Sequence, residues 1–299
     1  MNDNGWLETY RGTVFRWEVD NNDHLTVAYY FARLDDATRG ILHSLGLGAD
    51  YTGRTQRGCP TADCFVRYVK ELRVGDILHV TSGVLAVEKD ALVLGHKLFN
   101  SETDVLCTTI EQRLAHLGAD GKAVGFTDEQ RRAAETRRIA WDAPAREQRP
   151  RPPGLGGFRG SARDSVKQSE MDTFGRLALP AYIHRFSAAN AHALAAFGLS
   201  PGYMRDAQRG FSTFEFQCTF MGSLAAGDPV AVRSGLMHVG NSSIRLLHVM
   251  TNERSGEPVA SLEQSGVHLD LDARRPAPLP DALRQLAQAI LIRPTGPPS

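Results

Sequence analysis

The chain has 299 residues, of which 42% are hydrophobic and 23% charged, the balance of a globular protein with a substantial core and one or two domains. Its 34 basic and 34 acidic residues cancel, so no overall positive field would attract nucleic acid or an anionic membrane. No stretch approaches the roughly 18 apolar residues of a membrane span.

Four cysteines are spread along the chain, at Cys59, Cys64, Cys107 and Cys218. They form no Cys-x-x-Cys pair and no His/Cys metal spacing, so free, mostly buried thiols in a reducing cytoplasm are predicted. Residues 1–6 are polar and acidic, without the basic start and apolar run of a leader peptide. The Gly-rich string at 154–157 does not follow a strand, as a dinucleotide loop would. We therefore expect no cofactor, no nucleic-acid partner and no membrane partner.

The first predicted element is a β-rich lead-in over residues 12–19, which runs into a turn rich in Asp and Asn. A helix is predicted over residues 27–45, and Gly46 is its stop signal. Apolar residues recur along this helix every three or four positions, at Tyr30, Leu34, Ala37, Ile41 and Leu45. Strands are then predicted over residues 64–72, 77–87, 92–100 and 105–112, with turns at Gly75-Asp76 and Lys89-Asp90. One long helix followed by antiparallel strands is an α+β pattern in which the sheet wraps the helix.

The middle of the chain changes character. A surface helix is predicted over residues 126–139, with Thr127 as its cap and two acidic residues at its positive end. Residues 143–157 (APAREQRPRPPGLGG) form a Pro/Arg/Gly linker without a core-forming pattern. No aromatic residues interleave with its arginines, so these side chains are predicted to be solvated.

The chain contains an internal repeat. A shift of 152 residues aligns residues 11–112 with 163–264 without a gap, and 28 of those 102 pairs are identical, against roughly 6% for unrelated sequences. The identities include Asp20/Asp172, Tyr30/Tyr182, Gln56-Arg57-Gly58/Gln208-Arg209-Gly210, Ser82-Gly83/Ser234-Gly235 and Glu111-Gln112/Glu263-Gln264. The second copy therefore predicts a lead-in over 161–171, a helix over 179–197 that stops at Gly198, and a tail helix over 281–290. Two domains are predicted, at 1–140 and 161–299, joined by a linker at 141–160.

The turn before each long helix carries a motif. Residues 17–26 read WEVDNNDHLT, followed by Tyr30, Leu34, Asp35 and Ala37, and residues 170–177 read EMDTFGRL. Both copies resemble the hot-dog thioesterases of the 4-hydroxybenzoyl-CoA type. The signature of that family is an acidic residue, two variable positions, usually Gly-His, and then a helix with Tyr, an aromatic residue, Glu and Ala. The resemblance covers nearly the whole chain outside the linker.

The resemblance implies two tandem hot-dog domains, each with a long central helix wrapped by an antiparallel sheet. Hot-dog domains typically pair sheet to sheet with clefts between them, so we expect the two copies to form a pseudo-dimer. The sequence does not decide whether this pseudo-dimer assembles further into a homo-oligomer. Residues 1–140 expressed alone should expose the pairing surface and self-associate or aggregate.

The resemblance also implies an acyl-coenzyme A thioesterase with a coenzyme A thioester as substrate. In family members of this pattern, the carboxylate that aligns with Asp20 is the nucleophile or the general base on water. An early helix N–H, near Val27 here, would hold the oxyanion, and His24 would lie beside the carboxylate. The matching positions of the second copy are Asp172 and Leu179.

Each candidate residue also has a purely structural interpretation. Asp20 could stabilise the turn, as Asp routinely does, and His24 could be a structural turn residue. Asp35 could be a solvated residue of the helix surface or a secondary acid. The repeated Gln56, Arg57 and Gly58 could contact the substrate or seal the contact between the copies.

The two copies are not equivalent. The first keeps His24 and Asp35 but has Asp23 where the family usually has Gly, whereas the second has Arg176 and Ser187 in place of the histidine and the acid. The sequence thus favours the site around Asp20. Two alternatives remain: a hot-dog hydratase or dehydratase acting on enoyl- or hydroxyacyl-thioesters, whose Gly-Asp-x-Asn-Pro-x-His string is not present, and a non-catalytic acyl-CoA binder.

Overall fold

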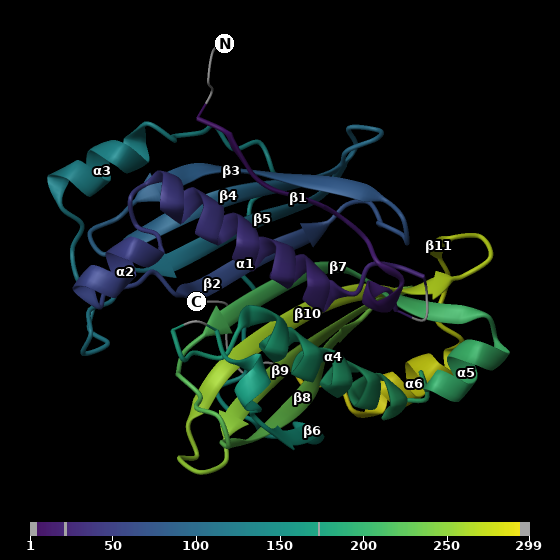
Figure 1. The fold of residues 1–299 in the computed structure, drawn as a ribbon. Coiled ribbons are helices and arrows are strands. Elements are labelled where there is room, and N and C mark those ends of the chain that lie inside the picture. The colour runs from purple at the N-terminus through teal and green to yellow at the C-terminus, as the bar shows by residue number, and fades with distance from the viewer. Residues whose placement is uncertain (1–4, 21–22, 173, 294–299) are drawn as a thin grey trace. The chain divides into compact units, whose positions relative to one another are not determined.

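The computed structural model describes residues 5–20, 23–172 and 174–293 (Figure 1). Of the motif residues, Asn21, Asn22 and Thr173 lie outside the described ranges. The chain divides into two compact units, Met1–Pro144 (unit 1) and Ala145–Ser299 (unit 2). Each unit has one long helix and an antiparallel sheet, which confirms the α+β class predicted for each copy.

In unit 1 the strands follow the order β1-β3-β4-β5-β2, and every neighbouring pair is antiparallel. The strands are β1 (Leu7–Thr13), β2 (Thr61–Tyr68), β3 (Ile77–Val87), β4 (Ala91–Asn100) and β5 (Leu106–Ala115). The helices are α1 (Val27–Ser44), α2 (Ala49–Thr55) and α3 (Asp128–Glu135). Figure 1 shows α1 lying along one face of this sheet.

Helix α1 packs on the sheet through the apolar stripe predicted from the sequence. All five residues of that stripe are at most 4% exposed. On β4, Leu92, Leu94 and Leu98 are buried in the same apolar clusters. Because successive strand residues point to opposite faces, Gly95 and Lys97 lie on the outer face, away from the helix. Each fully buried apolar side chain contributes roughly 1.5–3 kcal/mol, so the stripe is sufficient to fix α1 on the sheet.

A chain of buried polar side chains crosses the inner face of the same sheet. Ser82 Oγ lies 2.7 Å from His96 Nδ1, and His96 Nε2 lies 3.1 Å from Gln112 Oε1. Thr38 Oγ1 of α1 lies 2.8 Å from the same amide oxygen. Because an amide oxygen only accepts, His96 carries its proton on Nε2 and accepts the Ser82 hydroxyl proton on Nδ1. Burial lowers the pKa of His96 to about 4, so its ring is neutral at pH 7.

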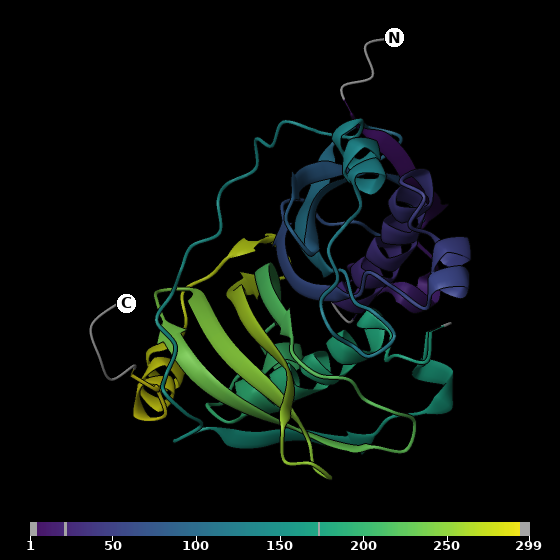
Figure 2. The same cartoon turned by 90° about the vertical axis from the view of Figure 1, so that its left-hand side faces the viewer.

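Unit 2 has the strand order β7-β10-β9-β8-β6, with the short β11 paired to β10 (Figure 2). The strands are β6 (Arg159–Ser165), β7 (Arg209–Phe220), β8 (Pro229–Val239), β9 (Ser243–Asn252), β10 (Pro258–Asp270) and β11 (Arg275–Pro276). The helices are α4 (Leu179–Ala195), α5 (Pro201–Asp206) and α6 (Asp281–Ala289). The order of strands and helices in unit 2 repeats that of unit 1, as the internal repeat predicts.

The repeated Ser-Gly pair has a packing role on both faces of the sheet. Ser234 Oγ lies 2.6 Å from His248 Nδ1, as Ser82 contacts His96 in unit 1. The neighbouring glycines lie on the outer faces, where a Cβ on Gly83 would come within 2.4 Å of Ile139 and one on Gly235 within 2.5 Å of Ile292. The Ser-Gly pair is therefore the same in both copies because the serine makes a hydrogen bond on the inner face and the glycine leaves room for an isoleucine on the outer face.

The structure differs from several predicted elements, and it contains two short helices that the sequence does not predict. The lead-in predicted over 12–19 ends as a strand at Thr13 and continues as a 3-10 turn, Arg16–Glu18, which the Glu18 carboxylate closes by accepting the Phe15 N–H at 3.0 Å. The sequence does not predict α2 or α5, because helices of 7 and 6 residues are too short to show an apolar period. The helix predicted over 126–139 is shorter, although Thr127 caps it as predicted.

The start of the linker covers the outer face of the unit 1 sheet. Trp141 Nε1 donates to Glu111 Oε1 at 3.0 Å, and its ring lies over Gly95, where a Cβ would come within 2.8 Å. Lys97 Nζ lies 2.7 Å from an Asp142 carboxylate oxygen and 5.2 Å from the centre of the Trp6 ring. This part of the linker is therefore a packed element of unit 1.

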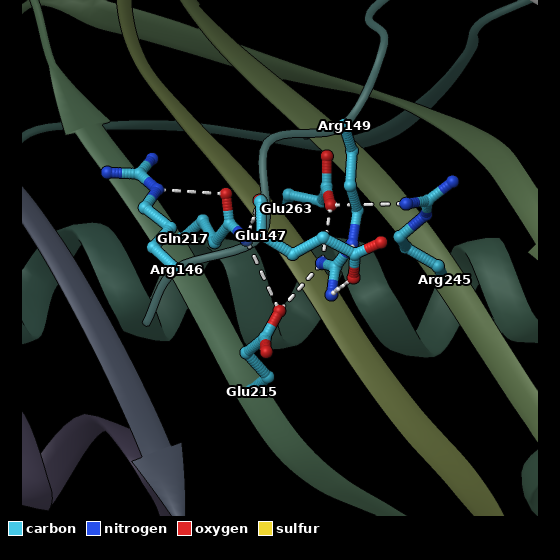
Figure 3. A network of polar contacts seen from close by, with 7 residues as sticks. All are labelled: Arg146, Glu147, Arg149, Glu215, Gln217, Arg245 and Glu263. Carbon is cyan, nitrogen blue, oxygen red and sulfur yellow. Dashed lines mark hydrogen bonds and ion pairs between the residues drawn. The ribbon is translucent and has the colours of Figure 1, made fainter. Parts of the chain in front are cut away.

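The basic part of the linker is bound to the outer face of the unit 2 sheet (Figure 3). Arg149 Nη1 donates to Glu215 Oε1 at 2.6 Å and to Glu263 Oε1 at 2.8 Å. Arg146 Nε donates to Gln217 Oε1 at 3.0 Å. The Arg149 side chain is only 12% exposed, so the prediction of solvated linker arginines is wrong at this residue. The reason is the pair of buried carboxylates, which need a positive charge beside them.

Candidate active site

The motif loop of unit 1 closes a tight hairpin immediately before α1. Val19 and Leu25 form an antiparallel bridge, and the Asp20 N–H donates to the His24 carbonyl at 2.8 Å. Asp20 Oδ1 in turn accepts the His24 N–H at 3.1 Å. Asp23 has a φ of 60°, a left-handed conformation that Asp tolerates better than most residues, which explains how it replaces the usual Gly.

The matching loop of unit 2 has the same backbone hydrogen bonds. The Asp172 N–H donates to the Arg176 carbonyl at 2.7 Å, and Asp172 Oδ1 accepts the N–H groups of Phe174 and Arg176 at 2.8 and 2.9 Å. Gly175 stands at the left-handed position with a φ of 70°. Asp172 and its counterpart in unit 1 therefore both stabilise their turns, which is the structural role expected as the alternative.

A histidine–glutamate pair distinguishes the loop of unit 1. His24 Nε2 lies 2.6 Å from Glu71 Oε2, and the two side chains are 13% and 30% exposed. Glu71 Oε1 also accepts from Arg73 Nε at 3.0 Å. The repeat places Arg176 and Ser223 at the positions of His24 and Glu71 in unit 2, so unit 2 cannot form this pair. The sequence motif does not reveal Glu71, because it lies outside the motif and its counterpart in the repeat differs.

The first turn of α1 offers backbone donors next to the loop. The cap residue Thr26 makes no side-chain cap hydrogen bond, and among the described residues the N–H groups of Val27 and Ala28 have no acceptor. In α4 the corresponding residues are Leu179 and Pro180, and a proline has no N–H to offer. Unit 1 therefore presents two N–H groups without an acceptor in the described ranges at the positive end of its helix dipole, and unit 2 can present at most one.

The other predicted site residues of unit 1 lie elsewhere. Asp35 pairs with Arg39 one turn further along α1, at 3.0 Å, with 32% of its side chain exposed. Residues 56–58 follow α2, beyond the far end of α1, which is roughly 27 Å long at 1.5 Å per residue over its 18 residues. Within unit 1 the structure thus brings Asp20, His24 and Val27 together, and it does not bring Asp35 or residues 56–58 to them.

The repeated Gln-Arg-Gly has a local explanation in both units. Gln56 ends α2 with a φ of 55°, and its side chain donates to the carbonyl of Gly53, three residues back. Gln208 follows α5 with a φ of 50° and donates to Arg205 in the same way. A polar side chain that satisfies a helix-end carbonyl stabilises such a left-handed cap, so this motif marks the end of a short helix.

The described residues contain no group of three or more His, Cys, Asp and Glu side chains placed to hold a metal ion. None of the helices in those ranges is long and apolar enough to cross a membrane. Cys64, Cys107 and Cys218 are buried, as predicted, and Cys59 is partly buried.

Comparison with protein families decides the class of the protein. The profile of the thioesterase-like superfamily matches residues 14–139 and 166–286, which is more than half of the chain and falls in both units. The chain belongs to the thioesterase-like superfamily. The two matched segments correspond to the two copies of the repeat, which confirms a tandem protein of the family that the motifs resemble. Membership confirms the predicted enzyme class, a thioester hydrolase.

Relatives of this chain carry more specific names. The betainyl-CoA thioesterase of Pseudomonas aeruginosa is 26% identical over 115 residues, which cover 38% of this chain and 72% of that protein. The L-carnitine dehydrogenase/betainyl-CoA thioesterase of Agrobacterium fabrum is 31% identical over 99 residues, 33% of this chain and 20% of that protein. Each of these matches covers less than half of the present chain.

Solved structures share the fold. An acyl-ACP thioesterase from Bacteroides thetaiotaomicron has a TM-score of 0.68 at 13% identity and covers 88% of this chain and 98% of its own. The 12:0-ACP thioesterase from Umbellularia californica has a TM-score of 0.68 at 10% identity and covers 88% and 94%. At such low identity the likeness concerns the fold alone, and it confirms the predicted hot-dog architecture.

Proposed function

We propose that the protein hydrolyses an acyl-coenzyme A thioester at the N-terminus of α1 in unit 1. The observation that carries the proposal is the set of groups gathered there: Asp20, the His24–Glu71 pair and two unused helix N–H groups. A carboxylate, an oriented imidazole and an oxyanion hole are the groups that acyl transfer from a thioester requires. The relatives named betainyl-CoA thioesterases support coenzyme A as the thiol part of the substrate.

In the proposed reaction, Asp20 attacks the thioester carbonyl carbon or removes a proton from a water molecule that attacks it. The carbonyl oxygen becomes negative and is held by the N–H groups of Val27 and Ala28. The carbon–sulfur bond then breaks, and coenzyme A leaves as a thiolate that takes up a proton. His24, held by Glu71, orients the water or supplies that proton. In the nucleophilic route, a water molecule finally hydrolyses the anhydride formed on Asp20.

Unit 2 is the less suitable site for this chemistry. It retains Asp172, but Arg176 and Ser223 replace the histidine and its partner, and Pro180 removes one N–H from the helix start. A duplicated enzyme can lose one site while the other remains sufficient. We therefore assign the reaction to unit 1. We propose that Asp172 and Leu179 have only a structural role in unit 2 and take no part in the reaction.

A non-catalytic acyl-CoA binder is the second candidate. Its support is that Asp20 and Asp172 both use a carboxylate oxygen to stabilise their own turns. Buried cysteines at three positions fit a reducing compartment, and we propose the cytoplasm.

The test is release of free coenzyme A by the purified full chain without added metal. Aromatic, short-chain, medium-chain and betainyl thioesters should be offered, with a thiol reagent as the readout and a chelator in a parallel sample. We expect turnover of at least one ester and no effect of the chelator. Stoichiometric binding without turnover would establish the binder, and hydration of an enoyl-CoA or dependence on metal would place the protein in another class.

A further inference from the structure

An ion pair lies beside the motif loop in both units; it is fully buried in unit 1, and in unit 2 the Glu170 side chain is 22% exposed. Arg33 Nη2 contacts both carboxylate oxygens of Glu18 at 2.7 Å, and the two residues are 7% and 4% exposed. In unit 2, Arg185 contacts Glu170 at 2.8 and 3.1 Å. All four residues are identities of the internal repeat.

Glu18 touches the chain on both sides of the loop. Its carboxylate accepts the N–H of Phe15, before the loop, at 3.0 Å. Its backbone carbonyl accepts the N–H of Thr26, the cap of α1, at 2.8 Å. Its ion-pair partner Arg33 belongs to α1 itself. The loop that carries Asp20 is therefore fixed at its entry, at its exit and against the helix by one side chain and its backbone.

Arg33 extends this connection to the sheet. Its Nη2 also lies 3.3 Å from the Thr13 carbonyl at the end of β1, and its guanidinium carbon lies 5.5 Å from the centre of the Tyr10 ring. The pair thus connects β1, the 3-10 turn and α1 at one point. Unit 2 repeats the arrangement, since Glu170 accepts the N–H groups of Lys167 and Ala178 at 2.7 and 3.0 Å.

Stability alone is a weak reason for such a pair. Removing two charges from water is expensive, and apolar residues of similar volume often stabilise a fold equally well or better. A buried contact of this kind does fix geometry, because Arg33 Nη2 can reach both carboxylate oxygens of Glu18 only in a narrow range of orientations. A carboxylate and oxyanion donors that act together need that kind of fixing, within a fraction of an ångström.

We propose that Glu18 and Arg33 are the positioning residues of the site, which hold the Asp20 loop against the free N–H groups of Val27 and Ala28. This inference rests on the function proposed above. It does not make either residue catalytic, because both are buried beneath the loop and act through it. The equivalent pair in unit 2 holds a loop of the same shape, which takes no part in the proposed reaction.

The duplication supplies a matched control within the chain. The double variants Glu18→Gln/Arg33→Met and Glu170→Gln/Arg185→Met each remove the ion pair without leaving a lone buried charge, because Asp164, the second partner of Arg185, is 42% exposed. Both should lower the melting temperature, and the unit 2 variant also loses the contact of Arg185 with Asp164 at 2.8 Å. Only the unit 1 variant should lower kcat for the acyl-CoA ester, by about tenfold to a hundredfold with KM within about threefold, as misplacement of reacting groups predicts.

Hydrogen exchange measured by mass spectrometry on the full chain gives a readout that does not depend on turnover. In Glu18→Gln/Arg33→Met, the amides of His24 and Thr26 should exchange at least about tenfold faster, while those of β4 stay protected. Equal kcat for both double variants, or a loss confined to the unit 2 variant, would overturn the inference. If the wild-type chain hydrolyses no ester, the proposed function fails, and hydrogen exchange alone then tests the positioning role. Unchanged exchange rates of the His24 and Thr26 amides in the unit 1 variant would overturn that role.

Discussion

Replacement of His96 by glutamine tests the buried polar chain in the core of unit 1. Burial lowers the pKa of His96 from 6.5 to about 4, because the charged ring would lose its water. The unfolded chain therefore takes up a proton below pH 6.5, whereas the folded chain does not do so until about pH 4. Stability must fall as the pH falls through this window, and it is fully present above pH 6.5.

The size of this effect follows from the pKa shift. One pKa unit corresponds to about 1.4 kcal/mol, so His96 should account for roughly 3 kcal/mol of lost stability at pH 4. His96→Gln keeps an amide that can contact Ser82 or Gln112 and should cost about 1–2 kcal/mol at pH 7.5. Because the variant has no imidazole to protonate, the stability curves of variant and wild type should converge or cross as the pH falls.

Urea unfolding followed by circular dichroism at steps from pH 7.5 to 4.5 measures these curves. The exposed His43, changed to glutamine, is the control for replacing a histidine outside the buried polar chain. A His96→Gln protein that loses as much stability on acidification as the wild type would refute the reasoning.

Three further predictions concern the pair beside the loop, the linker and the pairing of the copies. Glu71→Gln removes the charge that holds His24, so it should lower kcat by about tenfold without unfolding the protein. Ser223→Ala, at the matching position of unit 2, should leave kcat unchanged. A Glu71→Gln protein with the kcat of the wild type would exclude the pair from the reaction. Arg149→Met removes the positive charge beside the buried Glu215 and leaves Glu263 with Arg245 alone, at 3.6 Å, so it should destabilise unit 2 by about 3–5 kcal/mol. The exposed Arg151→Met should cost less than about 1 kcal/mol, and equal thermal stability of the two variants contradicts the bound linker. Residues 1–140 alone should self-associate or aggregate, and a half-chain that stays monomeric at high concentration argues against a pseudo-dimer.

The fold could be predicted from the sequence because both copies of the internal repeat carry the same pattern. A gapless repeat and the apolar stripe of α1 specify one helix and one sheet in each copy, and the structure has both. The boundaries near residues 12–19 could not be predicted, because the 3-10 turn depends on the Glu18 carboxylate and on Arg33, which is distant in sequence. The bound state of Arg149 also depends on distant residues, since its carboxylate partners belong to β7 and β10.

The candidate site could be predicted only in its local part. Asp20, His24 and Val27 are close in sequence, so the motif brings them together without knowledge of the fold. Glu71 reaches His24 only through the β2–β3 connection, and unit 2 has a serine at its position. Glu18 and Arg33 are identical in both copies, so a search of the repeat for polar identities would have found them.

The central claim is that Asp20 of unit 1, and not Asp172 of unit 2, performs the chemistry. The most direct test measures kcat for a hydrolysed acyl-CoA ester in Asp20→Asn and Asp172→Asn side by side, with melting temperatures for both. Asparagine keeps the oxygen that accepts the loop N–H but loses the charge needed for attack or proton removal. Asp20→Asn should lower kcat by about two orders of magnitude or more, and Asp172→Asn should cost much less. An inactive Asp172→Asn protein would place the site in unit 2, and full activity of both variants would leave the two aspartates as turn residues alone.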